Sequence, residues 1–129
     1  MSELLGREQI LGAEDLETKD VEVPEWGGTV RVRGLSAGER DRHEMRMALA
    51  QRDGVLTDVR ASVVASAIID ENGKRVFSDA EIMVLSKKSA DALDRLFDVV
   101  SKLSGMTEEK LREAVQAFLQ SRANGSPSA

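Results

Sequence analysis

The feature that most constrains the fold is the segment Val21–Leu35, in which two alternating stretches flank a turn. Apolar and polar side chains alternate at Val21–Val23 and again at Thr29–Arg33, and a period of two is typical of strands with one buried face. Pro24 cannot donate a hydrogen bond to a neighbouring strand, so it ends the first stretch. Gly27–Gly28 permits the backbone reversal. The segment therefore predicts an antiparallel hairpin with these side chains pointing inward: Val21, Val23, Val30 and Val32.

The rest of the chain reads mainly as helices. Ser36–Glu39 and Ser78–Glu81 have the spacing of capping boxes, in which Ser and a Glu three residues later start a helix. The segment 57–68 is either a buried helix or a strand, and its length favours the helix. Gly105 is placed to end a helix that begins at Ser86 or Ser89. We expect helices at about 37–51, 57–68, 79–85, from Ser86 or Ser89 to 104, and from Thr107 onward.

The predicted fold class is α+β and mostly helical, with an N-terminal β-hairpin followed by four to five packed helices. Asn72-Gly73 is a strong turn signal, so a second short hairpin is possible there. Residues 1–18 are expected to be an N-terminal arm, either a short helix or a loop that pins apolar side chains onto the domain. Residues 19–122 are expected to form one globular domain, and residues 123–129 a flexible tail.

Composition limits the classes of function. At 129 residues the length fits one domain with one core, which must be aliphatic because aromatic residues are only 3% of the chain. The absence of cysteine excludes disulfides, thiolate metal sites and cysteine nucleophiles. A net charge of −5 disfavours binding to nucleic acid or to an anionic membrane. We expect neither a signal peptide nor a membrane span.

The sequence offers little catalytic chemistry. His43, the single histidine, lies among charged residues on a predicted helix, and we interpret it as a solvated helix residue. The segment Asp70–Glu81 has the length of a calcium loop, but Lys74 and Arg75 stand where ligands and a glycine are needed. We therefore expect no enzyme activity, no metal and no cofactor.

Five residues are candidates for binding a partner: Trp26, Arg31, Arg33, Phe97 and Phe118. Trp26 is either an interaction anchor on its Pro/Gly loop or a lid over the core. Arg31 and Arg33 either meet an acidic partner or pair with Glu22, Glu25 and Glu39. Phe97 and Phe118 belong to the apolar faces of the last two helices, which form either core or an open groove for another amphipathic helix.

Three segments, spread from about residue 20 to 120, carry a resemblance to a known family. They are Val23–Ser36 around Val-Pro-Glu-Trp-Gly-Gly, then Ile69–Ser78, then Leu103–Glu109. In order and spacing they resemble the small tail assembly chaperones of long-tailed (siphovirus-type) bacteriophages and prophages. The resemblance implies a viral tail assembly factor in the cytoplasm of the bacterial host.

The same resemblance implies the partners. A chaperone of this family would bind the tape measure protein, keep it soluble and promote assembly of the tail tube protein around it, with self-association also possible. This role needs no cofactor. The alternative is a structural virion protein, such as a tail-completion or head-tail joining subunit.

Overall fold

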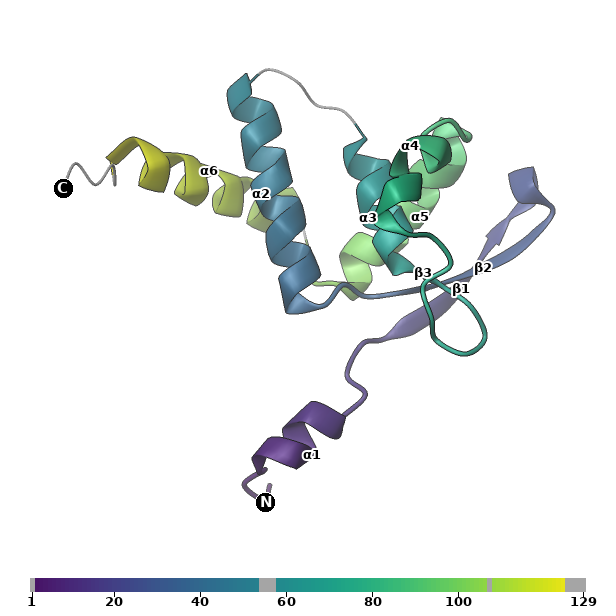
Figure 1. The fold of residues 1–129 in the computed structure, drawn as a ribbon, viewed down its shortest axis with the longest axis horizontal. Coiled ribbons are helices and arrows are strands. Elements are labelled where there is room, and N and C mark those ends of the chain that lie inside the picture. The colour runs from purple at the N-terminus through teal and green to yellow at the C-terminus, as the bar shows by residue number, and fades with distance from the viewer. Residues whose placement is uncertain (1, 54–57, 107, 125–129) are drawn as a thin grey trace.

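The computed structural model describes residues 2–53, 58–106 and 108–124, and the fold is α+β and mostly helical, as the sequence predicts (Figure 1). A three-stranded antiparallel sheet has the strand order β1-β2-β3. The strands and short 3₁₀ helices are β1 (Thr18–Val23), η1 (Pro24–Trp26), β2 (Gly28–Arg33), β3 (Ile68–Ile69) and η2 (Asp79–Glu81). The α-helices are α1 (Arg7–Gly12), α2 (Ala37–Asp53), α3 (Val59–Ala67), α4 (Ile82–Leu85), α5 (Ala90–Leu103) and α6 (Glu108–Asn124).

The predicted hairpin is formed by β1 and β2, with Val21 opposite Val30 and Gly27 at a φ of 76° in the turn. Helices α3 and α5 pack against the sheet. Val23 and Val32 are completely buried and Val21 nearly so, while Val30, closer to the turn, is only half-buried. The alternation in sequence therefore places the valine face correctly, although Val30 is less buried than the other three valines.

Local sequence signals set the helix boundaries. Ser36 and Glu39 form the predicted capping box: the Glu39 N–H donates to the Ser36 hydroxyl and the Ser36 N–H donates to the Glu39 carboxylate. Ser89, rather than Ser86, caps α5 by accepting from the Ala92 N–H. Gly105 follows α5 with a φ of 68°, as expected of a helix-ending glycine. The predicted Thr107 cap lies outside the described residues.

Most of the segment 57–68 forms helix α3, as predicted, but its last residue, Ile68, belongs to the sheet. Ile68 and Ile69 form β3, which pairs with Val32 and Arg31 of β2. The chain then turns at Gly73, whose φ is 79°, and Ile69 forms an isolated bridge with Arg75. The second hairpin therefore exists as this minimal pairing.

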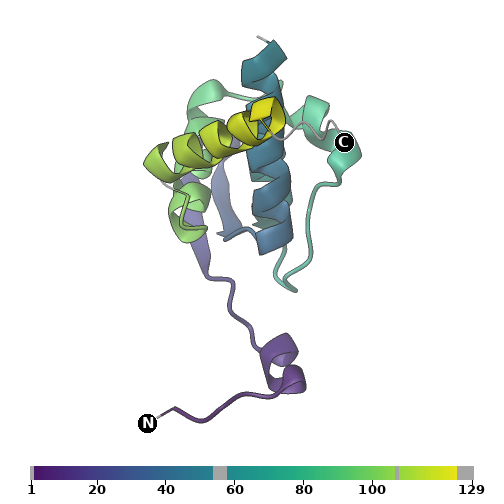
Figure 2. The same cartoon turned by 90° about the vertical axis from the view of Figure 1, so that its left-hand side faces the viewer.

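Helices α2 and α6 form a pair at the side of the domain. Helix α2 contacts both α3 and α6, and α6 packs mainly against α2, not against α5 (Figures 1 and 2). Of the two possibilities for the last two helices, an open groove between their described residues is therefore not formed. Helix α6 continues to Asn124, two residues into the predicted tail, and residues 125–129 lie outside the described part.

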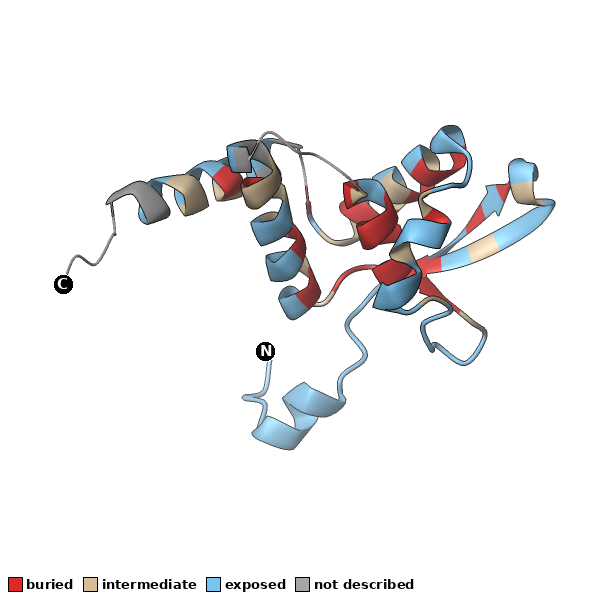
Figure 3. Cartoon of the chain, turned by 45° about the horizontal axis from the view of Figure 1, so that its top comes forward, coloured by how far each residue is buried: buried red, intermediate tan, exposed pale blue. Residues whose placement is uncertain are grey.

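The N-terminal segment contains the short helix α1 and does not pin apolar side chains onto the domain. Both views show α1 standing apart from the sheet and the other helices (Figures 1 and 2). All residues from 2 to 20 are exposed, whereas buried residues concentrate where α3, α5 and the sheet meet (Figure 3). The end of the segment is held to the domain by a backbone hydrogen bond, which the Gly34 N–H donates to the Glu17 carbonyl at 2.8 Å.

Candidate partner-binding surfaces

Phe97 lines the larger of two apolar hollows, which we call the Phe97 groove. The groove has a volume of about 390 Å³ and lies where α2, α3 and α5 meet. Its apolar lining comprises Met47, Val59, Ala61, Ala90, Leu93 and Phe97. Charged residues also line it, and two of them, Arg60 and Asp94, form an ion pair at 2.6 Å. An apolar floor with paired charges suits an amphipathic helix from a partner.

Trp26 is half-buried and lines a second hollow, which we call the Trp26 depression. The depression has a volume of about 290 Å³ and is lined by Trp26, Thr29, Val30, Arg31, Ile68, Ile69, Val76 and Phe77. The indole packs against the core, yet it also borders this open hollow. The hairpin loop that carries it is held by Glu25, whose carboxylate receives two hydrogen bonds from Arg95 of α5. Trp26 thus packs on the core, as a lid would, and its partner-binding role stays a prediction.

Arg31 and Arg33 are both paired within the chain. Arg31 donates to Asp20 on the neighbouring strand at 2.7 Å, so the expectation that it meets Glu22 or Glu25 is wrong. Arg33 forms two hydrogen bonds with Glu39 at 2.8 and 3.0 Å, as predicted. Burial alone would raise the pKa of Glu39, but the hydrogen bonds from Arg33 and from the Ser36 backbone outweigh it and hold the pKa at about 2.

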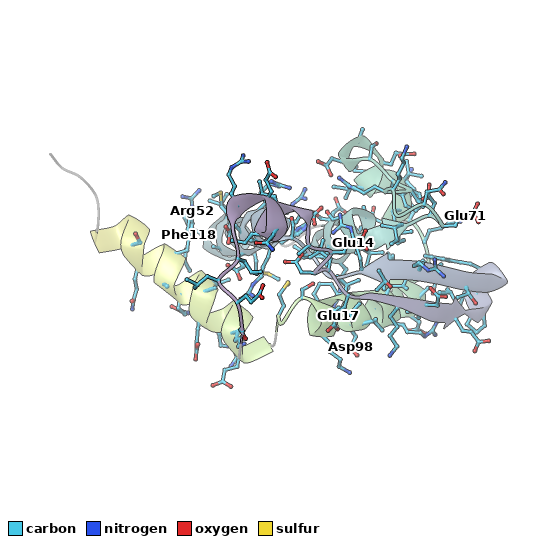
Figure 4. All side chains as sticks on the ribbon, turned by 90° about the horizontal axis from the view of Figure 1, so that it is seen from below. Glu14, Glu17, Arg52, Glu71, Asp98 and Phe118 are labelled. Carbon is cyan, nitrogen blue, oxygen red and sulfur yellow. The ribbon has the colours of Figure 1, made fainter. Side chains whose placement is uncertain are left out.

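Phe118 lies on α6, the helix that packs against α2, and Figure 4 shows it in the same region as Arg52 of α2. The Phe97 groove and the Trp26 depression share no lining residue. The structure therefore brings Trp26 and Arg31 together at one depression but does not gather all five predicted binding residues into one site.

His43 is not a solvated helix residue. It is 7% exposed, because α2 presses it against α3, where it lies between Ser62 and Ser66. Burial, followed by the positive charge of Arg46, lowers its pKa from 6.5 to about 4. The sequence prediction failed because the burial of His43 depends on the packing of α3 against α2, which the charged neighbours in the sequence do not reveal.

A direction can be assigned to each hydrogen bond around His43. Ser66 Oγ donates to the Ser62 carbonyl, so it must accept from His43 Nε2. Because the lowered pKa keeps the imidazole neutral at pH 7, its single proton is on Nε2 and Nδ1 is an acceptor. Ser62 Oγ, which accepts from Arg46 at 2.7 Å, therefore donates to His43 Nδ1. The polar hollow beside it, the His43 pocket, has a volume of about 260 Å³ and is lined by Arg42, His43, Arg46, Ser62, Ser66, Asp79 and Ile82.

Exposed apolar side chains are a feature that sequence reasoning largely missed. The N-terminal segment exposes Leu4, Leu5, Ile10, Leu11 and Leu16, and the domain exposes Met45, Val76, Met83 and Val84. The described residues contain neither a group of three or more His, Asp or Glu placed to hold a metal nor a helix able to cross a membrane.

Comparison with known proteins identifies the class. The model of a family described as phage tail assembly chaperone matches residues 13–115. The chain therefore belongs to this family, which is a class of chaperones and not of enzymes, and the resemblance seen in the sequence is confirmed. A search of curated proteins gives no match.

A solved structure is similar over most of both chains. It is the tail assembly chaperone of bacteriophage HK97, with a TM-score of 0.55 and 22% sequence identity. The similarity covers 74% of this chain and 90% of that one. At this identity it shows a shared fold.

Proposed function

We propose that this chaperone binds a helical segment of the tape measure protein and keeps that protein soluble while the tail tube protein assembles around it. The proposal rests on family membership together with the open Phe97 groove. Its place of action would be the cytoplasm of the bacterial host.

The physical task explains why an apolar groove matters. Long helical proteins with apolar stripes aggregate unless those stripes are covered. A helix laid in the Phe97 groove would bury its apolar side chains against Met47, Leu93 and Phe97. Because the chain carries a net charge of −5, the complex would keep a charged outer surface.

Co-expression with the tape measure gene of the same phage tests the proposal. We expect the tape measure protein to be recovered in the soluble fraction and in complex with this chain. Equal solubility with and without the chain, and no recovered complex, would contradict it. Mass spectrometry of mature particles separates the alternative, because a structural virion subunit would remain in the particle and a chaperone would not.

A further inference from the structure

The His43 pocket contains two arginines that no carboxylate of the described residues pairs with. Six other arginines do form ion pairs with carboxylates: Arg31, Arg33, Arg40, Arg60, Arg75 and Arg95. Arg42 and Arg46 form none within the described residues, although both line this one pocket. They are four residues apart on α2, a spacing at which like charges repel.

The other groups around the pocket do not supply the missing negative charge. Asp79 lines the pocket, but its carboxylate receives a hydrogen bond from Arg75 at 3.0 Å. Glu39, one turn before His43, is already held by Arg33. The hydroxyl protons of Ser62 and Ser66 are used inside the network described above. An incoming carboxylate would therefore be received by the two guanidinium groups.

Two partly or fully exposed apolar side chains belong to the helices that form the pocket. Met45 lies between Arg42 and Arg46 in the sequence and is 49% exposed, and Ile82 of α4 lines the pocket. A ligand that fits this surface would bring carboxylates for the arginines and aliphatic side chains for Met45 and Ile82.

The N-terminal arm, residues 2–17, has this chemistry. It contains five carboxylates and one arginine, a net charge of −4, interspersed with the exposed leucines and isoleucine named above. Figure 4 labels two of its acids, Glu14 and Glu17, on the segment that leads away from the sheet. None of its residues is buried in its own domain, and the described residues give its carboxylates no ion-pair partner.

We propose that the arm of one copy docks on the α2 face and His43 pocket of a second copy, where its acids pair with Arg42 and Arg46 and its leucines cover Met45. If both copies exchange arms, the contact is reciprocal and closes as a two-fold dimer. This inference stands independently of the tape measure proposal, because it concerns a surface that does not include the Phe97 groove.

Sedimentation equilibrium of the full chain, up to millimolar concentration, tests this. The pocket variant is Arg42→Gln, and the arm variant is Glu8→Gln/Glu14→Gln/Asp15→Asn. We expect the parent to dimerise and each variant to weaken the dimer by about tenfold or more. The control Arg112→Gln removes an exposed cation on α6 and should change the dimer constant less than about twofold.

A mixing experiment and an NMR readout complete the design. Arm and pocket variants, each weakened alone, should form a mixed dimer through the one intact contact. The imidazole signals of His43, the single histidine, should shift with dimerisation in the parent and not in the arm variant. A parent that stays monomeric, a dimer unaffected by the arm variant, or His43 shifts without a change in mass would each overturn the proposal.

Discussion

Ser62 and Ser101 are both buried serines, yet their hydroxyls have opposite roles. Ser62 Oγ links Arg46 to His43, whereas Ser101 Oγ has no hydrogen-bond partner in the described structure. We predict that Ser62→Ala lowers the free energy of unfolding by about 1–2 kcal/mol, because it leaves a ring nitrogen of His43 unpaired. The matched control Ser101→Ala should be neutral or stabilising, since it removes an unsatisfied polar group. Urea unfolding measures both, and equal losses would refute the assigned network.

As pH falls, the free energy of unfolding should decrease first because of His43 and then, at lower pH, because of Glu39. The pKa of His43 is 6.5 when unperturbed and about 4 in the fold, so the unfolded chain takes up the proton more readily between these values. The free energy of unfolding should therefore be fully present above pH 6.5 and fall as pH drops toward 4. The pKa of Glu39 is lowered from 4.5 to about 2, which predicts a further loss between those two values.

A variant separates the two groups. Glutamine does not titrate in this range. In His43→Gln the free energy of unfolding should therefore no longer change between pH 6.5 and 4 because of residue 43, while the loss due to Glu39 at lower pH should remain. Urea unfolding at a series of pH values measures this. A variant with the same pH dependence as the parent would show that His43 is not buried as described.

At the scale of elements, the junction between the hairpin and α2 depends on close backbone packing. A Cβ built on Gly34 would lie 2.9 Å from the carbonyl oxygen of Leu103, at the end of α5. We predict that Gly34→Ala destabilises the fold by about 1–3 kcal/mol, as overpacking does. Gly28→Ala is the control, because nothing lies within 4 Å of its Cβ position and its φ is not positive. Thermal melting of both variants checks this, and equal melting temperatures would contradict the close contact.

Most elements could be predicted from local signals. The hairpin, the Ser36–Glu39 cap, the end of α5 at Gly105 and the helical character of α3 follow from periodicity, capping and glycine chemistry. What the sequence did not show is which apolar faces meet. Helix α6 packs on α2 and not on α5, and this pairing is tertiary. His43 is buried for the same reason, since its burial depends on where α3 lies.

At the scale of the whole molecule, the candidate site was only partly predictable. Phe97, predicted to bind a partner, does line a groove, but Met47 and Val59 come from distant parts of the chain and join it only in the fold. The arginines were singled out on the wrong element: Arg31 and Arg33 of β2 pair with carboxylates, whereas Arg42 and Arg46 of α2 form no ion pair within the described residues. Which charged side chains pair depends on their distance in the folded structure, and residue spacing in the sequence does not predict that distance.

The central claim is that the Phe97 groove receives a tape measure helix. Ala90 lines the groove, is exposed and is the first residue of α5, where a glutamate is favourable to the helix. Ala90→Glu should therefore block the groove without unfolding the chain. Ala80→Glu is the matched control, because Ala80 is also exposed and lines none of the three hollows described here.

The most direct measurement is isothermal titration of each purified chain with the tape measure protein of the same phage. The account predicts that Ala90→Glu weakens binding by about tenfold or more, while Ala80→Glu binds as the parent does. Parent binding should also show the negative heat-capacity change of apolar burial. Undiminished binding by a folded Ala90→Glu chain would contradict the claim.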